Sequence, residues 1–173
     1  GEVELKDIDI AVVASYGKII PKEILDIPKF GALNIHPSLL PKYRGPSPIQ
    51  ATILNGDKET GVTIIKLDEK MDHGDIVASE KLKVEIEKLY YKELHDKLAE
   101  LGAELLIKIL PDYISGKIKP TPQNHSEATF TKIITKDDAR IDWNFSKQKI
   151  QSIIRAYHVW PVAWTTFNGK RLK

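Results

Sequence analysis

The sequence contains no cysteine, which excludes disulfide bonds and thiolate metal sites and suits a reducing compartment. It contains no apolar run close to the roughly 20 residues that a membrane-spanning helix needs. Its first ten residues, GEVELKDIDI, lack the basic segment and the apolar segment of a signal peptide. The formal net charge of +2 is too small to identify a nucleic-acid-binding protein by itself. These absences favour a cytoplasmic protein that is not associated with a membrane.

The 173 residues suit one mid-sized domain, or one domain with part of a second. Hydrophobic residues make up 42% and charged residues 29%, as in globular proteins that bury a core. The chain begins without a methionine and stops just after an Asn168-Gly169 turn. We therefore expect both ends to interrupt a longer protein.

Hydrophobic patterning predicts an α/β fold. Residues 8–16 are almost continuously apolar, which is typical of a strand buried on both faces of a parallel sheet. Residues 31–36 predict a second buried strand, and residues 61–68 and 75–86 predict two strands joined by a hairpin loop. Short helices are expected after Pro21 and up to Asn55-Gly56. The longest helix follows from the spacing of Leu94, Leu98, Leu101, Leu105 and Ile109, and we expect it to end at Pro111.

A polar stretch with two prolines, residues 115–130, separates this layer from the C-terminal part of the chain. That part contains a short DDARIDW segment, an amphipathic helix over residues 146–157 and a strand with a turn. The chain is thus predicted to divide into an α/β unit over residues 1–118, a linker over 119–136 and the start of a second unit over 137–173.

One polar pair stands out in the segment GALNIHPSLLPKYRGPSPIQ. Asn34 and His36 point to the same face because side chains alternate along a strand. They stand at the carboxyl end of that strand, where open α/β sheets bind ligands, and Pro37 ends the strand behind them. An amide N–H and an imidazole aimed at one point make an oxyanion site. The alternative, that Asn34 caps a turn and His36 is a buried structural histidine, stays open on these residues alone.

Two further groups carry charge. The segment DEKMDHGDI places three aspartates around His73 and Gly74, without the spacing or the terminal glutamate of a calcium loop. A hairpin with solvated charges explains it equally well. Lys42 and Arg44 flank Tyr43 and suit either phosphate contact or a solvated surface.

Five segments occur in one order along the chain: NIHPSLLPKYRGPSPIQ, NGDKETGVTIIKLDEKMDHGDI, DKLAELGAELLIKIL, DDARIDW and IRAYHVWP. Together they resemble the folate-dependent formyltransferases, in particular the members that act on methionyl-tRNA. The resemblance implies an α/β fold with a partial Rossmann-like sheet and flanking helices. It also implies that residues 1–118 are the catalytic core and that residues 137–173 begin a small β-barrel-like domain that helps to hold tRNA.

The resemblance assigns roles to individual positions. The family's catalytic residues fall on Asn34, His36 and Asp72. Its folate-contacting turn falls on Ser38, Leu39, Leu40 and Pro41. The implied formyl donor is 10-formyltetrahydrofolate and the implied acceptor is the α-amino group of initiator methionyl-tRNA, with no metal and no covalent enzyme intermediate. Lys42 and Arg44 are candidates for contacts with tRNA phosphate.

In the chemistry that this implies, Asn34 and protonated His36 stabilise the negative oxygen of a tetrahedral intermediate. Asp72 favours the imidazolium form of His36 and holds a water that carries the proton from the amine to the leaving folate nitrogen.

The chain departs from the family at its ends and at one internal position. The family's N-terminal half and most of its C-terminal barrel are not in the sequence, so we expect the chain alone to be weakly active or inactive. We also expect its exposed sheet to favour dimers or strand swapping. His158-Val159 stands where the family usually has Asn-Pro. A sugar-nucleotide N-formyltransferase and a non-catalytic folate-binding module remain alternative functions.

Overall fold

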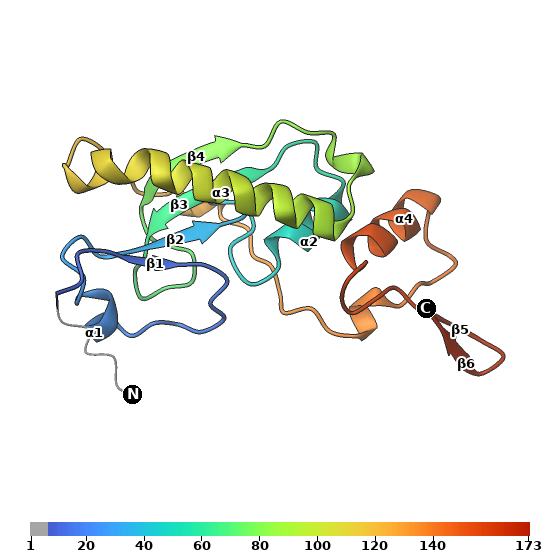
Figure 1. Cartoon of the computed structure of the whole chain (residues 1–173). Coiled ribbons are helices and arrows are strands. Elements are labelled where there is room, and N and C mark those ends of the chain that lie inside the picture. The colour runs from blue at the N-terminus through green and yellow to red at the C-terminus, as the bar shows by residue number, and fades with distance from the viewer. Residues whose placement is uncertain (1–6) are drawn as a thin grey trace.

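The computed structural model of the chain describes residues 7–173 (Figure 1). The strands are β1 Ala11–Val13, β2 Ala32–His36, β3 Gly61–Lys66, β4 Ile76–Lys81, β5 Thr165–Phe167 and β6 Lys170–Leu172. The α-helices are α1 Lys22–Leu25, α2 Pro48–Asn55, α3 Tyr91–Ile114 and α4 Lys147–Ala156. Three short 3₁₀ turns lie at Ile86–Lys88, His125–Glu127 and Asp137–Ala139.

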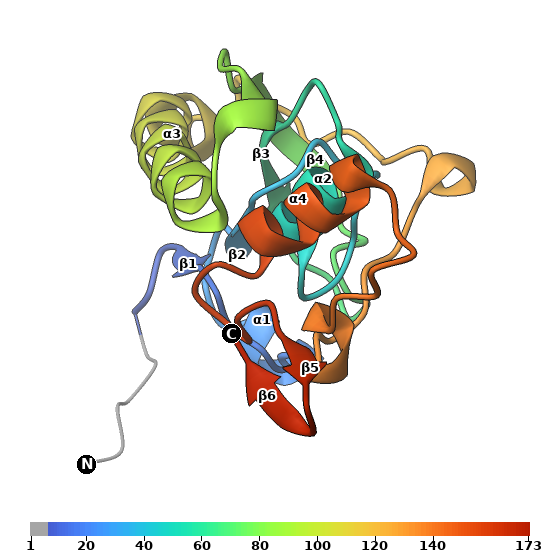
Figure 2. The same ribbon diagram turned by 90° about the vertical axis from the view of Figure 1, so that its right-hand side faces the viewer.

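Four of these strands form one mixed sheet in the order β1-β2-β3-β4. β1 and β2 are parallel, whereas β2/β3 and β3/β4 are antiparallel, with the second pair forming the expected hairpin. α3 lies along one face of this sheet, as Figures 1 and 2 show. The predicted α/β architecture, with a partial sheet and flanking helices, is confirmed.

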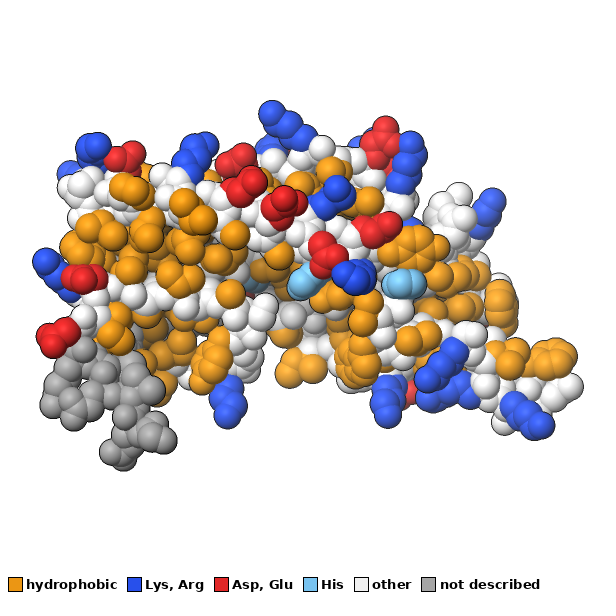
Figure 3. Space-filling model, in the orientation of Figure 1, with side chains coloured by type: hydrophobic (Ala, Val, Ile, Leu, Met, Phe, Trp, Pro, Cys, Tyr) orange, Lys and Arg blue, Asp and Glu red, His pale blue; other side chains and the backbone are white. Residues whose placement is uncertain are grey.

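The expectation that the first strand is buried on both faces is wrong. β1 has three residues, and its central Val12 is 48% exposed. In the described part of the chain β1 pairs with β2 alone, so it is an edge strand. Figure 3 shows hydrophobic side chains gathered over the part of the surface where β1 and α3 lie.

The apolar stripe of α3 packs on the sheet as its spacing predicts. Leu94, Leu98, Leu105 and Ile109 are buried in two clusters that also contain residues of β2, β3 and β4. The predicted end of this helix at Pro111 is wrong, because the helix continues to Ile114. Pro111 lies on the exposed side of the helix, so water can reach the carbonyl that its missing N–H leaves free.

The C-terminal part of the chain packs against the first part. α4 lies against α2, and Ile153, Tyr157 and Trp164 share a buried cluster with Ile53 and Leu94 (Figure 2). The β5/β6 hairpin projects from this end of the molecule (Figure 1). The expected unit boundaries at residues 118 and 137 stay a prediction.

The stretch predicted to be a linker runs along the sheet and its loops. Thr121 pairs with Ile76, and Phe130 pairs with Arg44 in a second isolated bridge. Gln123 is only 4% exposed. Residues 119–136 are thus fixed to the rest of the fold by backbone and side-chain contacts. Within residues 7–173, no helix combines the length and the apolar character needed to cross a bilayer.

Candidate active site

The predicted catalytic residues line one cleft of about 660 Å³. Asn34 and His36 come from the last three residues of β2, and Asp72 comes from the loop between β3 and β4. The other walls are the segment after β1, the start of α2 and one side of α3. The antiparallel β3/β4 hairpin brings the Asp72 loop back to the end of β2, although 38 residues separate Asn34 from Asp72.

The three side chains meet at a single oxygen atom. Asp72 Oδ1 lies 3.4 Å from Asn34 Nδ2 and 3.5 Å from His36 Nδ1. Both distances are longer than a typical N–H···O hydrogen bond, so neither side chain engages Asp72 Oδ1 tightly. The other carboxylate oxygen, Oδ2, accepts a 2.6 Å hydrogen bond from the Gly45 N–H. Asp72 is therefore anchored through Oδ2, while Oδ1 faces Asn34 and His36.

His36 is oriented by a backbone carbonyl. Its Nε2 lies 2.9 Å from the Tyr43 carbonyl oxygen, which can only accept, so Nε2 carries a hydrogen. A change in protonation of His36 therefore occurs at Nδ1, the nitrogen that faces Asp72.

Asp72 favours the imidazolium form of His36, as expected, but burial of the ring outweighs this effect on its pKa. Burial lowers the pKa of His36, and the Asp72 carboxylate and the Tyr43 carbonyl offset this only in part. His36 is 4% exposed, so the cost of desolvating a positive charge outweighs the attraction of Asp72. The structure thus favours the neutral form of His36.

The turn predicted to contact folate is held inside the protein. Thr63 Oγ1 donates a 2.7 Å hydrogen bond to the Ser38 carbonyl and accepts a 3.0 Å bond from the Leu40 N–H. Ser38 Oγ donates to the Lys42 carbonyl at 2.6 Å. None of the four turn residues Ser38, Leu39, Leu40 and Pro41 is among those that line the cleft, whereas the preceding Pro37 is. A folate contact by this turn stays a prediction.

The two basic residues have different environments. Lys42 is half exposed and forms an ion pair with Asp57 at 2.9 Å. Arg44 is 3% exposed, so the expectation of a solvated surface is wrong for its side chain, whereas a phosphate contact stays a prediction. Its guanidinium donates to Gln123 Oε1 at 3.2 and 2.7 Å and to His125 Nδ1 at 2.8 Å. Sequence reasoning missed this because the partners lie about 80 residues further along the chain.

Sequence reasoning also missed several residues around the cleft. Tyr91 and His95 of α3 and Met71 of the loop that contains Asp72 contribute to its walls. Gly45 supplies the N–H that anchors Asp72, and Gln123 contacts the backbone of the same loop. No local pattern marks Gln123, whereas the glycine at position 45 beside two prolines could have been recognised as a site of close backbone approach.

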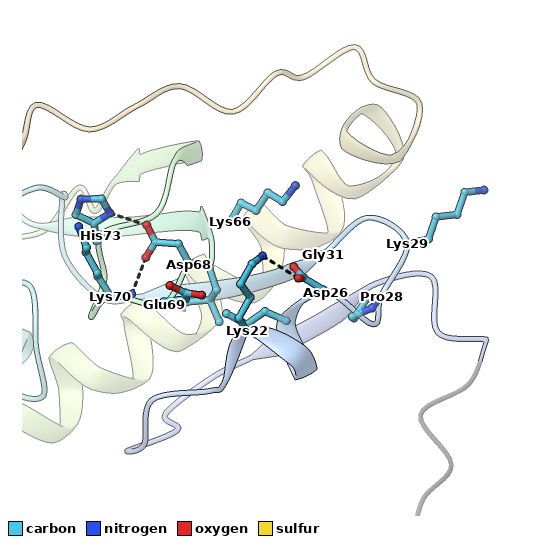
Figure 4. Close-up of a pocket in the computed structure, with 12 residues that line it drawn as sticks. Lys22, Asp26, Pro28, Lys29, Gly31, Lys66, Asp68, Glu69, Lys70 and His73 are labelled. Atoms are coloured by element: carbon cyan, nitrogen blue, oxygen red, sulfur yellow. Dashed lines mark hydrogen bonds and ion pairs between the residues drawn. The ribbon is translucent and has the colours of Figure 1, made fainter.

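A second pocket, of about 480 Å³, adjoins the first, because Leu25, Leu67, Asp68 and Lys70 line both (Figure 4). Its walls are mainly charged, and Figure 4 shows Lys22 pointing to Asp26 and His73 pointing to Asp68. It contains none of the predicted catalytic residues. Across the described residues, no group of three or more histidine, aspartate or glutamate side chains is arranged to hold a metal ion.

Comparison with known proteins finds relatives that are similar over most of this chain. The Methylacidiphilum infernorum protein named methionyl-tRNA formyltransferase is 52% identical over 158 residues, which are 91% of this chain and 49% of that protein. The chain thus spans about half the length of the curated relatives it matches.

Solved structures share the fold. HypX from Aquifex aeolicus, in complex with tetrahydrofolic acid, superposes with a TM-score of 0.84 at 24% identity, covering 97% of this chain and 29% of that one. A methionyl-tRNA formyltransferase from Clostridium thermocellum superposes with a TM-score of 0.73 at 25% identity, covering 94% of this chain and 69% of that one.

Two family models match the sequence directly. The model described as formyl transferase, C-terminal domain, matches residues 133–173. The model described as formyl transferase matches residues 1–110, which is more than half of the chain. The chain therefore belongs to the formyl transferase family.

Proposed function

We propose that this chain carries the catalytic core of an enzyme that transfers a formyl group from 10-formyltetrahydrofolate to the α-amino group of initiator methionyl-tRNA. The observation that carries the proposal is the approach of Asn34 Nδ2 and His36 Nδ1 to one oxygen of Asp72 at the wall of a large cleft. A hydrogen-bond donor, an imidazole and a carboxylate at one point are the groups that acyl transfer to an amine requires.

Asn34 stabilises the negative charge that develops during attack. The neutral amine nitrogen bonds to the formyl carbon, which becomes tetrahedral, and the formyl oxygen becomes an oxyanion. The hydrogen bond from Asn34 Nδ2 to Asp72 Oδ1 is long, at 3.4 Å, so the Asn34 N–H can turn to this oxygen at little cost. Loss of such a donor typically lowers the rate by about 10²–10³-fold.

Asp72 and His36 move the proton. The attacking nitrogen must lose one proton, and the N10 atom of tetrahydrofolate must gain one when its bond to the formyl carbon breaks. Asp72 Oδ1 accepts the proton directly or through a water, and His36 Nδ1, 3.5 Å away, can share it before its transfer to N10. A neutral His36, with its Nδ1 lone pair available, suits this role better than a fixed imidazolium does.

The identity of the acceptor rests on the relatives. The 52% identical protein from Methylacidiphilum infernorum is named for methionyl-tRNA, which supports tRNA over a sugar nucleotide as acceptor. In this proposal residues 1–118 form the catalytic core, and residues 137–173 begin a tRNA-binding domain. Of the two basic residues predicted to contact tRNA phosphate, Lys42 and Arg44, Lys42 is the more accessible, because it is half exposed on the loop after β2.

The test uses the protein that carries this chain, with charged initiator tRNA and 10-formyltetrahydrofolate as substrates. Asn34→Ala, His36→Ala and Asp72→Ala are each expected to lower the transfer rate by about 10²–10³-fold, and their combinations should be far from additive. Glu100→Ala, on the exposed side of α3, removes a carboxylate outside the cleft and should leave the rate unchanged.

Near-normal transfer by Asn34→Ala would contradict the assignment of the site. Faster formylation of an amino-sugar nucleotide than of charged tRNA would overturn the choice of acceptor.

A further inference from the structure

Gln123 is a buried amide that contacts the catalytic loop from outside the cleft. It is 4% exposed and lies in the stretch that the sequence predicts to be a linker. Its Nε2 donates to the Asp72 carbonyl oxygen at 2.9 Å and to the Gly74 carbonyl oxygen at 2.8 Å. Two backbone groups on either side of His73 are therefore held by one side chain.

Arg44 fixes the orientation of this amide. A guanidinium can only donate, so the Gln123 atom that it contacts at 3.2 and 2.7 Å must be Oε1. The two loop carbonyls can only accept, so the atom that faces them must be the NH₂ group. All hydrogen-bonding positions of the Gln123 amide are thus used, and rotating it by 180° would break all four bonds.

The loop needs such support because its backbone is strained. Asp72 has a φ of 47°, in the left-handed region that aspartate adopts more often than most residues but less readily than glycine. A residue in this conformation costs about 1–2 kcal/mol and persists only where its surroundings hold it. The carbonyl that Gln123 holds belongs to this same residue.

Arg44 also connects the loop to the anchor of the Asp72 carboxylate. Its own N–H and carbonyl pair with Thr129 and Thr131 at 2.8 and 2.7 Å, which fixes its backbone to the stretch that contains Gln123. The next residue, Gly45, donates its N–H to Asp72 Oδ2 at 2.6 Å. Gln123 therefore holds the main chain of Asp72 and Gly45 holds its carboxylate, and Arg44 connects these two residues.

We propose that Gln123, oriented by Arg44, is a positioning residue that holds the Asp72 loop so that Asp72 Oδ1 faces Asn34 and His36. As a role in catalysis, this rests on the proposed formyl transfer. A ring stack adds to the same contact, since His125 lies parallel to His73 with centroids 4.0 Å apart. The stretch predicted to be a linker is thus part of the support of the site, although none of its residues lines the cleft.

Gln123→Glu is the sharpest test. The substitution keeps the shape of the side chain and gives buried Arg44 an ionic partner, but a carboxylate cannot donate to the two loop carbonyls. We expect kcat to fall by about 10²-fold, the loss typical of a misplacement of about 1 Å, with KM for 10-formyltetrahydrofolate close to that of the wild type. Gln148→Glu makes the same chemical change at an exposed position of α4 and should alter neither.

A second readout does not depend on formyl transfer. The Gly45 amide proton, bonded to a carboxylate at 2.6 Å, should give a downfield-shifted and exchange-protected NMR signal in this chain. Gln123→Glu should move that signal upfield and increase its exchange, whereas Gln148→Glu should not. If the wild-type protein does not transfer formyl groups at all, the proposed function fails, but this readout still tests the positioning.

Unchanged kcat and an unchanged Gly45 signal in folded Gln123→Glu would overturn the proposal. The unsubstituted chain supplies a further test in case the variant does not fold. The two side-chain amide protons of Gln123 should then exchange slowly with solvent, because both are bonded within the protein. Exchange as fast as that of exposed Gln148 would equally refute the proposed role.

Discussion

Replacing Gly74 by alanine is expected to move the catalytic loop. A Cβ atom at this position would lie 1.8 Å from the Lys66 carbonyl oxygen, 2.9 Å from its carbonyl carbon and 3.3 Å from the Asp68 nitrogen. All three are backbone atoms, so no side-chain rotation can relieve the conflict. Since Cβ atoms essentially never approach another atom within 3.0 Å, the loop and the end of β3 must separate by about 1.2 Å.

This displacement sets the expected magnitude. Asp72 lies two residues before Gly74, and its carboxylate must stay within reach of Asn34 and His36. A misplacement of about 1 Å typically costs about 10²-fold in rate, which corresponds to about 2.7 kcal/mol in the barrier. Overpacking of this kind also lowers the free energy of unfolding by about 1–3 kcal/mol.

Two assays separate these effects. Urea unfolding of the chain measures the loss of stability, and single-turnover formyl transfer by the protein that carries it measures the loss of rate. Gly116→Ala is the matched control, because Gly116 has a φ of 75° and no atom within 4 Å of the added Cβ. It should cost about 1–2 kcal/mol of stability through backbone strain and leave transfer unchanged. Formyl transfer at the wild-type rate by the Gly74→Ala protein would contradict the expected displacement of the Asp72 loop.

Two further predictions concern stability. Because burial lowers the pKa of His36 below its unfolded value of about 6.5, the unfolded state binds more protons below that pH. The free energy of unfolding should therefore decrease as the pH is lowered from 7.5 to 5.5, and it should decrease less in His36→Gln. Urea unfolding across this pH range measures both changes. An equal pH dependence in the two proteins would contradict the prediction. Gly102→Ala should destabilise the chain by about 1–3 kcal/mol, although alanine favours helices, because the new Cβ would lie 2.6 Å from Ile35 Cγ2. Most of this cost should disappear when Ile35 is also replaced by alanine. A double-mutant cycle of unfolding free energies measures the coupling between the two positions, and a coupling of zero would exclude the clash.

Features that depend on local patterns could be predicted from the sequence. α2 ends where Asn55-Gly56 suggests, and Gly56 has the positive φ of 65° that such a helix end requires. Asn34 and His36 stand at the end of β2 because the alternation of a strand is a local property. The two long antiparallel strands also follow from their apolar runs, although β4 ends at Lys81, five residues before the expected boundary.

Features that depend on distant partners could not be predicted. The exposure of Val12 depends on which strands flank β1. Pro111 can lie within α3 because it stands on the side of the helix that faces water. Arg44 resembles a surface cation in its local sequence, and its buried guanidinium depends on Gln123 and His125, which lie 79 and 81 residues away. The neutral form of His36 likewise depends on the depth of its burial, which no spacing of residues reveals.

The position of Gln123 in the chain has a consequence for the nascent protein. Asp72 and Gln123 are separated by 51 residues, so about 3–10 s of synthesis pass between them at about 5–20 residues per second. During that interval Asn34, His36 and Asp72 have all been made, but the side chain that holds the Asp72 and Gly74 carbonyls has not. The ribosome therefore adds Asn34, His36 and Asp72 before it adds Gln123, so the hydrogen bonds that hold the Asp72 loop can form only later.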